Sequence, residues 1–371
     1  MPVDEPRPPR QYQDFLPADQ PVQYVDTAGR ATDAAARYPV PDNDRLAEMY
    51  RKMLLGRRFD QQATALTKQG RLAVYPSSRG QEACQIAAAM CLEADDWMFP
   101  TYRDSVALTA RGVDPVQILS MLAGDWHCGY DPFVHRSAPQ CTPLATQLLH
   151  ATGVAFAEAR KGTGSLALAF CGDGATSEGD FHEALNFAAV FNAPVIFLVQ
   201  NNGFAISVPL ARQTVAPSLA HKGVGYGIGS EQVDGNDPVA MLAVMDAAAH
   251  FVRSGAGPVI IEAHTYRIDA HTNADDATRY RTSTEVEKWL QRDPLKRLET
   301  YLRDRGALDD AAIEKITAQA ETEAAQLRAG MNADRPADPA DLFKYVFAEP
   351  TSQLREQHAQ VVAELAAEKE D

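Results

Sequence analysis

The sequence lacks any apolar run of the roughly 18 residues that a membrane-spanning helix needs. Its first 30 residues also lack an apolar stretch, and they contain the acidic residues Asp4, Glu5, Asp14, Asp19 and Asp26. This composition argues against a secretory signal, and it fits poorly with a transit peptide, which is poor in acidic residues. We therefore expect a cytoplasmic protein that is not embedded in a membrane.

Cysteine is scarce, and basic residues are outnumbered. The five cysteines form no C-x-x-C pair, and an odd count without such pairs indicates reduced thiols in a cytosolic protein. The 35 Lys and Arg residues face 50 Asp and Glu residues, which leaves a net charge of -15. That balance argues against a nucleic-acid binder and against docking on anionic membranes.

Helical or strand periodicity is almost absent from the first 41 residues, which hold eight of the 23 prolines. We interpret residues 1–43 as an extended N-terminal arm that lies on a partner or is disordered. A helical pattern starts at Asp44, with Leu46 and Met49 among the apolar residues on one face. The 371 residues allow two domains, or one large α/β domain with appendages.

Residues 44–284 alternate helix-like segments with apolar runs, most of them too short for amphipathic helices. Continuous apolar strands separated by helices predict a parallel sheet that is covered on both faces. The fold class predicted is therefore α/β, with a doubly wound, mostly parallel sheet flanked by helices. The predicted strands are Trp97–Phe99, Leu166–Cys171, Val195–Val199, Glu231–Val233 and Val259–Ala263.

The character of the chain changes at about Glu285. Residues 285–371 are predicted to form a C-terminal helical region packed on the same domain. Its predicted elements are a helix over Glu285–Leu302, a helix over Asp309–Gly330 capped by Asp309 or Asp310 and stopped by the glycine, a linker rich in Pro, Asp and Ala over 331–340, and a last helix from about Thr351 to the end.

Polar residues directly follow two of the predicted strands. The strand that ends at Cys171 runs into Gly172-Asp173-Gly174, and the strand that ends at Val199 runs into Gln200-Asn201-Asn202-Gly203. The 26 residues between Gly174 and Asn201 suffice for one helix and one strand. The two polar turns should therefore lie at neighbouring strand ends, where parallel sheets bind ligands.

A carboxylate and a carboxamide oxygen that converge in this way suit Mg²⁺, which takes its other ligands from water and phosphate. Gly172 and Gly174 permit a tight turn and the close approach of a diphosphate. The helix that follows, from about Gly179, adds amide donors for an anion. Either motif alone is more often a plain turn, but both together, each closing an apolar strand, favour a binding site.

The pair resembles the thiamine diphosphate-binding motif, in which G-D-G is followed about one helix and one strand later by N-N. The chain is further similar, from about Gln20 to Gln360, to one family: the alpha subunits of the decarboxylating first component of 2-oxo acid dehydrogenase complexes. The stretches that carry this likeness are Arg79–Ala83, Thr101–Asp104, Thr142–Gln147, Gly172–Phe181, Asn201–Ser207, Val233–Asp237 and Thr265–Arg281. The resemblance implies a thiamine diphosphate-binding fold and oxidative decarboxylation of a 2-oxo acid with thiamine diphosphate and Mg²⁺.

The resemblance also implies roles for individual residues. Asp173, the Asn202 side chain and the Phe204 carbonyl oxygen correspond to the family's Mg²⁺ ligands, and His271 corresponds to its catalytic histidine. Arg103 would meet the diphosphate, because a guanidinium binds phosphate bidentately. The full set of implied cofactor-binding residues is Tyr102, Arg103, Thr142, Leu144, Gly172, Asp173, Gly174, Ala175, Asn202, Phe204, Arg267 and His271.

Several positions depart from relatives. Asp269-Ala270 stand where some relatives have Gly followed by His or Pro, and Gln200 stands where one branched-chain relative has an Arg. Some members carry a phosphorylated serine where this chain has Thr272, so we do not predict that regulation. Potassium is a candidate ion at the Cys141–Gln147 loop, although a soft thiol is a poor ligand for it.

In this family the glutamate that activates the cofactor belongs to a separate beta subunit. The resemblance therefore implies an α2β2 heterotetramer that acylates the lipoyl domain of a dihydrolipoyl acyltransferase. Thr142–Gln147 favours branched-chain 2-oxo acids, as in 3-methyl-2-oxobutanoate dehydrogenases, over pyruvate, with an acetoin-cleaving homologue as a weaker option. A noncatalytic Mg²⁺ or nucleotide-binding module would not need the His271 loop, and the chain is too short for a stand-alone decarboxylase.

Overall fold

The computed structural model describes residues 15–32, 36–125, 127–333, 338–344 and 346–368. The chain divides into two compact units, Met1–Arg328 and Ala329–Asp371. The second unit contains α13 (Asp341–Lys344) and α14 (Ser352–Ala367), and its Phe343 and His358 rings lie 5.1 Å apart. The predicted domain boundaries at 43 and 284 both fall inside the first unit and stay predictions. Among the described residues, no helix is long and apolar enough to cross a membrane.

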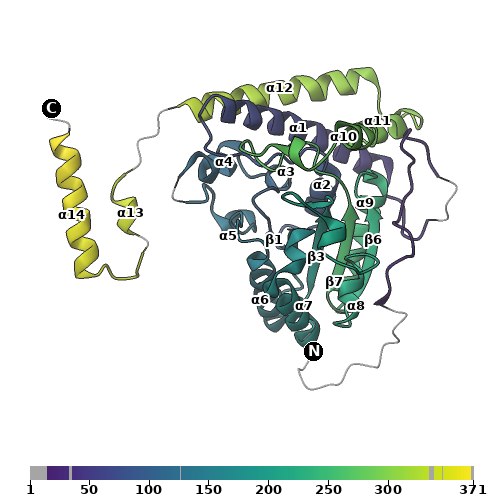
Figure 1. The fold of residues 1–371 in the computed structure, drawn as a ribbon, viewed down its shortest axis with the longest axis horizontal. Helices are drawn as coiled ribbons and strands as arrows, with labels where there is room; N and C mark the ends of the chain where they lie inside the picture. Colours follow the sequence, from purple (N-terminus) through teal and green to yellow (C-terminus); the bar gives the residue numbers. More distant parts are fainter. Residues whose placement is uncertain (1–14, 33–35, 126, 334–337, 345, 369–371) are drawn as a thin grey trace. The chain divides into compact units, whose positions relative to one another are not determined.

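A sheet of five parallel strands forms the centre of the first unit, in the order β1-β2-β3-β7-β6 (Figure 1). Each predicted strand is present, and four of them extend beyond the predicted ends. The predicted α/β class is confirmed. The strands are β1 (Trp97–Phe99), β2 (Ala167–Gly172), β3 (Val195–Asn201), β6 (Gly229–Asp234) and β7 (Val259–His264), and a small hairpin consists of β4 (Phe204–Ala205) and β5 (Val208–Pro209).

The strand order brings the two polar turns together. Gly172 lies opposite Gln200 where β2 pairs with β3, and Asn201 lies opposite His264 where β3 pairs with β7. The chain passes from β1 to β3 in one direction, crosses to β6 at the edge and returns to β7. The order therefore reverses between β3 and β7, and open α/β sheets bind ligands at such a point.

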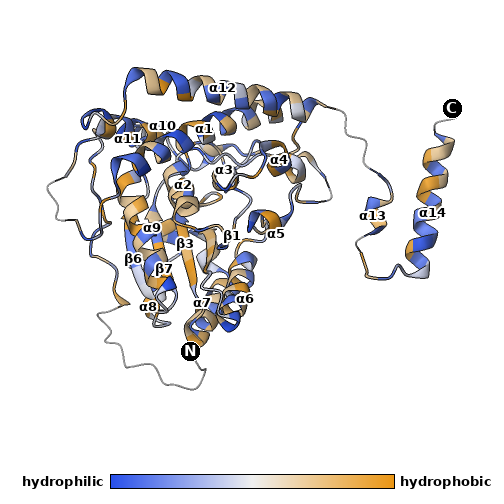
Figure 2. Cartoon of the chain, turned by 180° about the vertical axis from the view of Figure 1, so that it is seen from behind, coloured by the Kyte–Doolittle hydropathy of each residue, from blue (hydrophilic) through white to orange (hydrophobic). Residues whose placement is uncertain are grey.

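Helices cover both faces of the sheet. On one face, α6 (Thr146–Lys161) and α7 (Gly179–Phe191) pack on alternate strand residues, and Phe197 and Val199 are buried with Phe181 of α7. On the other face, α9 (Pro238–Arg253) packs on β3, β6 and β7, and α2 (Glu82–Met90) packs on α9. Burial on both faces explains why β3 is hydrophobic from Val195 to Val199, before its polar end (Figure 2).

Helix α1 (Asn43–Lys68) begins beside its cap Asp42, which accepts a hydrogen bond from Arg45 N at 2.8 Å. Leu46 and Met49 are buried, as the helical pattern predicts. The remaining helices of the first unit up to β7 are α3 (Ser105–Ala110), α4 (Pro115–Ala123), α5 (Pro132–His135) and α8 (His221–Val224), with short 3₁₀ turns at Gly174–Ser177 and Leu210–Arg212.

The prediction of one helix over Glu285–Leu302 is wrong. The segment forms α10 (Ser283–Leu290) and α11 (Pro294–Arg303), because Pro294 has no N–H to continue a helix and instead starts a new one behind the cap Asp293. Helix α12 (Asp310–Asn332) begins directly after Asp309, whose side chain accepts from Ala312 N at 2.8 Å. Gly330 does not stop this helix. Residues 334–337 of the predicted linker lie outside the described residues.

The described part of the N-terminal arm, residues 15–32, packs on its own chain instead of being disordered. That the arm lies on a partner stays a prediction. Val22 pairs with Val233 at the edge of the sheet, and the amides of Tyr24 and Val25 both donate to Asp237 Oδ2 at 2.6 Å. Arg297 of α11 is fully buried behind them. Its Nη1 lies 3.0 Å from Asp234 Oδ2 and its Nη2 lies 3.8 Å from Asp237 Oδ2.

Replacing Arg297 by Met should lower the free energy of unfolding by about 3–5 kcal/mol, because it leaves two buried carboxylates without their cation. Urea denaturation followed by circular dichroism measures this loss. Arg303→Met on the same helix is the matched control, since Arg303 forms an exposed ion pair with Glu299 and such pairs contribute little. Equal losses in both variants would contradict the role given to Arg297.

Candidate active site

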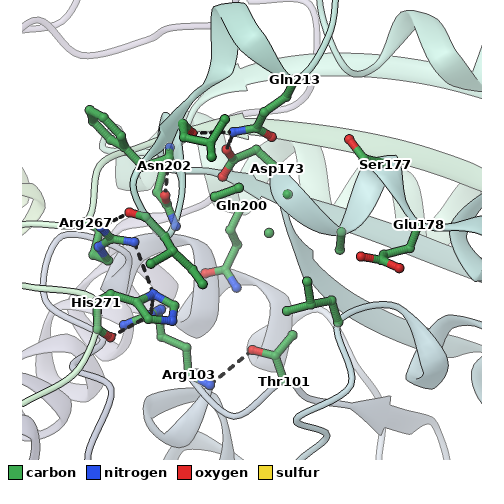
Figure 3. A pocket seen from close by; sticks show the side chains of 18 of the residues that line it. Thr101, Arg103, Asp173, Ser177, Glu178, Gln200, Asn202, Gln213, Arg267 and His271 are labelled. Atoms are coloured by element: carbon green, nitrogen blue, oxygen red, sulfur yellow. Dashed lines mark hydrogen bonds between the residues drawn. The ribbon is translucent and has the colours of Figure 1, made fainter. Parts of the chain in front are cut away.

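A pocket of about 380 Å³ opens where β2, β3 and β7 end (Figure 3). Asp173 follows β2, Asn202 follows β3, and Arg267 and His271 follow β7. Arg103 reaches the pocket from the loop after β1. Segments far apart in the sequence therefore supply one wall because the strands are parallel and adjacent.

Asp173 presents a free oxygen to this pocket. Its side chain is almost fully buried, its Oδ2 accepts from Gln213 Nε2 at 2.7 Å, and its Oδ1 has no hydrogen-bond partner among the described residues. Burial raises the pKa of Asp173, while the bond from Gln213 opposes that shift. A buried carboxylate oxygen without a donor is costly unless a cation takes it.

Asn202 and the two glycines complete the floor of the pocket. Asn202 Nδ2 donates to Gln81 Oε1 at 3.2 Å, and its Oδ1 accepts from Phe204 N at 3.2 Å. A side chain at Gly172 would meet nothing within 4 Å, so this position leaves open space for a ligand. A Cβ at Gly174 would lie 2.7 Å from Ala205 Cβ, so glycine lets the hairpin close over the turn.

Two buried guanidinium groups meet at one histidine. Arg103 Nη2 and Arg267 Nη1 each lie 3.2 Å from His271 Nδ1. Their other contacts are neutral: Arg103 donates to the carbonyls of Ser77 and His271, and Arg267 donates to the carbonyl of Ile206 and to a tyrosine hydroxyl. In the described part of the chain, neither arginine forms an ion pair with a carboxylate. Two such cations favour a doubly charged anion between them.

His271 is held neutral. Burial, with the nearby charges of Arg103 and Arg267, lowers its pKa to about 4, although Asp275 opposes this shift. Guanidinium groups can only donate, so Nδ1 must accept and the ring hydrogen lies on Nε2. His271 can therefore offer an N–H donor without carrying a charge at neutral pH.

A chain of buried side-chain amides continues from Asn202, which donates to Gln81. Gln81 Nε2 donates to Gln200 Oε1 at 3.0 Å, and Gln200 Nε2 donates to Asp104 Oδ1 at 2.6 Å. Gln200 is thus bonded within the wall, at the position where one branched-chain relative has an arginine, which would add a third cation. Burial raises the pKa of Asp104, and the hydrogen bonds from Thr101 and Gln200 oppose this rise.

The pocket brings together all but one of the residues implied by the resemblance. Thr142 is exposed and lies outside the lining, while Leu144, Ala175 and Phe204 line it. Tyr102 lies edge-on to the His271 ring, with centroids 6.1 Å apart. The loop with Cys141 is held by hydrogen bonds, including Gln147 Nε2 to Phe170 O at 2.7 Å. Potassium there stays a prediction.

Sequence reasoning missed Gln213 and Ile206. Gln213 lies 40 residues from its partner Asp173, and no local pattern signals such a contact. Ile206 has a φ of 55°, a strained conformation for a β-branched residue. Its carbonyl accepts from Arg267 at 2.8 Å, so the strained turn holds one of the two cations.

A family model described as "Dehydrogenase E1 component" matches residues 50–334. The chain belongs to the dehydrogenase E1 component family. The predicted family is therefore confirmed, and a noncatalytic binding module is no longer needed to explain the site. Members of this family that resemble the chain bear two different names.

An E1 relative from Mycobacterium tuberculosis, "3-methyl-2-oxobutanoate dehydrogenase subunit alpha", is 46% identical over 94% of this chain and 95% of its own length. "Pyruvate dehydrogenase E1 component subunit alpha" of Bacillus cereus is 36% identical over 91% of both chains. The protein of that name from Staphylococcus aureus is 39% identical over 77% of both chains.

His271 should not titrate near neutral pH. Histidine-selective NMR should give a pKa near 4, with His271→Gln used to assign the signal, and Arg267→Met should raise it toward its ordinary value by removing a neighbouring charge. Since the folded pKa is lowered, this group costs stability as the pH falls through its unfolded pKa near 6.5 toward 4. A signal that titrates at its ordinary value in the wild type would contradict the buried, neutral ring.

Proposed function

We propose that the chain is the alpha subunit of a branched-chain 2-oxo acid dehydrogenase, which decarboxylates 3-methyl-2-oxobutanoate and its kin and acylates a lipoyl group. The higher identity to the relative named for this substrate, 46% against 36% and 39%, supports this choice. A pyruvate dehydrogenase alpha subunit is the alternative, supported by the relatives of that name.

The observation that carries the proposal is the free Asp173 oxygen beside two arginines that lack a counter-anion. This combination fits a divalent cation bound to a diphosphate. Asp173, Asn202 and the Phe204 carbonyl would hold Mg²⁺, and Arg103 and Arg267 would bind the diphosphate. When bound, thiamine diphosphate supplies the electron sink for loss of carbon dioxide from a 2-oxo acid.

The chain's own side chains bind, orient and exclude water. The Nε2–H of neutral His271 can donate a hydrogen bond to a phosphate or to an oxygen of the reacting group. Leu144, Ile206 and Val208 contribute apolar surface to the pocket wall, and each is about half exposed. These side chains would keep water from one side of the site once the other side is covered.

We further propose that a beta subunit covers the open side, in an α2β2 assembly that acylates the lipoyl domain of a dihydrolipoyl acyltransferase. Exposed apolar side chains support a subunit interface: Phe187 and Val190 on α7, and Phe133 and Val134 on α5, are 49–75% exposed. All five cysteines are free thiols, which supports a cytoplasmic location.

Co-expression with a beta subunit, followed by ferricyanide reduction with thiamine diphosphate and Mg²⁺, tests the function. We expect a higher kcat/KM for 3-methyl-2-oxobutanoate than for pyruvate. A preference for pyruvate would favour the alternative. No turnover with either acid in an assembled, cofactor-loaded tetramer would contradict the proposed reaction.

Replacing Gln213 by Leu should weaken metal binding about 10- to 100-fold, because it frees the second oxygen of a metal ligand. Electron paramagnetic resonance of Mn²⁺ in the presence of thiamine diphosphate measures the affinity. Arg212→Gln, also in the pocket wall, is the control for a general disturbance of the loop. Unchanged Mn²⁺ affinity in Gln213→Leu would show that Gln213 does not orient Asp173.

A further inference from the structure

Asp269 connects the loop that carries His271 to a segment almost 200 residues away. Its Oδ2 lies 2.8 Å from Ser77 Oγ, and the same hydroxyl lies 2.8 Å from Asp60 Oδ2. Ser77 Oγ also accepts from Arg79 N at 3.1 Å. A hydroxyl has one hydrogen to donate, so Ser77 can serve only one of the two carboxyl groups as a donor. The other contact is a hydrogen bond only if that carboxyl group carries a proton.

Asp60 is the group that can carry this proton. It is 2% exposed, and its Oδ1 accepts from Tyr75 Oη at 2.8 Å and from Ser78 N at 2.7 Å. Burial raises its pKa to about 6, the three hydrogen bonds oppose that shift, and the charge of Glu82 on α2 adds to it. Glu82 is itself paired with Arg57, and Asp60 forms no ion pair with any of the described residues.

Asp269 is placed to carry the charge. Its side chain is 41% exposed, and its Oδ1 lies 3.7 Å from Arg79 Nη1. Water and the guanidinium can therefore solvate a negative charge there. The arrangement that satisfies every contact has Asp60 donating to Ser77 Oγ and Ser77 donating to Asp269.

The segment that contains Ser77 also contacts the site. Ser77 O accepts from Arg103 Nη1 at 2.9 Å, and Ser78 Oγ donates to Arg103 O at 2.6 Å. Tyr75 N donates to Asn273 Oδ1, on the His271 loop, at 3.3 Å. Residues 75–79 therefore hold Arg103 directly and also contact the loop that carries His271.

We propose that Asp269 is a positioning residue that holds the His271 loop against residues 75–79 by accepting the hydrogen of Ser77, whose oxygen accepts in turn from protonated Asp60. The expected effect on cofactor affinity rests on the proposed function. The expected effect on the ordering of the His271 loop does not. When Asp60 loses its proton as the pH rises, Ser77 can bond only one of the two carboxylates. The buried Asp60 carboxylate, at 2% exposure, needs that hydrogen more than the half-exposed Asp269 does, so Ser77 turns to Asp60 and the loop loses this attachment.

Three variants separate this role from general damage. Asp269→Ala removes the attachment at every pH. Asp60→Asn keeps it at every pH, because an amide N–H replaces the shared proton while the amide oxygen still accepts from Tyr75 and Ser78. Asp276→Ala is the matched control. This aspartate of the same loop is exposed, and its side chain bonds only to Thr278 in the described structure.

The first readout is hydrogen exchange of the backbone amides of residues 267–275 in the cofactor-free complex with its beta subunit. Asp269→Ala should raise their exchange about three- to tenfold, the effect of one hydrogen bond. The wild type should show a rise beyond the intrinsic pH effect between about pH 5 and about pH 7, and Asp60→Asn should not. Asp269→Ala exchange equal to that of the wild type and of Asp276→Ala would overturn the proposal.

The second readout is calorimetric titration with thiamine diphosphate and Mg²⁺. We expect the Kd to rise about three- to tenfold in Asp269→Ala. A Kd equal to that of the wild type and of Asp276→Ala would overturn the consequence for cofactor binding. Failure of the wild type to bind would contradict the proposed function instead, and the exchange experiment would still decide the role of Asp269.

Discussion

Two positive charges held at one imidazole are the constraint on which the rest of the site depends. Arg103 and Arg267 both lie 3.2 Å from His271 Nδ1, and like charges at this spacing repel each other strongly when they are buried. In the described structure the hydrogen bonds of both arginines go to neutral acceptors, which include three backbone carbonyls. Under the proposed function a diphosphate would offset the cost of burying the pair, and the folded chain would be organised for its anion before the anion binds.

Holding the pair together requires two loops to approach closely. Gly80 has a φ of 96°, and a Cβ there would lie 2.1 Å from Tyr266 O, so only glycine allows the segment after Ser77 to touch the segment that carries Arg267. Ile268 N then donates to Arg79 O at 3.2 Å. On the far side, the strained turn at Ile206 gives its carbonyl to Arg267. Backbone geometry, more than side-chain attraction, therefore fixes the distance between the two cations.

Local patterns in the sequence were sufficient to predict the sheet and the place of the site. Apolar runs predicted each strand of the sheet, and the polar turns after β2 and β3 predicted where Asp173 and Asn202 converge. What escaped prediction depends on contacts between side chains distant in the sequence. Nothing near Gln213 indicates that it reaches Asp173, and nothing near Arg297 indicates that it fastens the arm. The break at Pro294 was predictable, because an Asp-Pro pair often starts a helix. The prediction of one helix over Glu285–Leu302 did not take this pair into account.

The side chains proposed to bind the cofactor and its metal are buried, whereas the apolar side chains of the pocket wall are about half exposed. Asp173, Arg103 and Arg267 are at most 5% exposed, whereas Leu144, Ile206 and Val208 are 43–55% exposed. Buried groups that the chain already holds in place need little reorganisation to bind an anion or a cation. Half-exposed apolar groups take their final shape from whatever covers them. We infer that this chain fixes the cofactor, and that the choice among 2-oxo acids is completed at the surface where a second subunit meets it. One alpha-subunit fold can then serve relatives named for a branched-chain acid and for pyruvate alike.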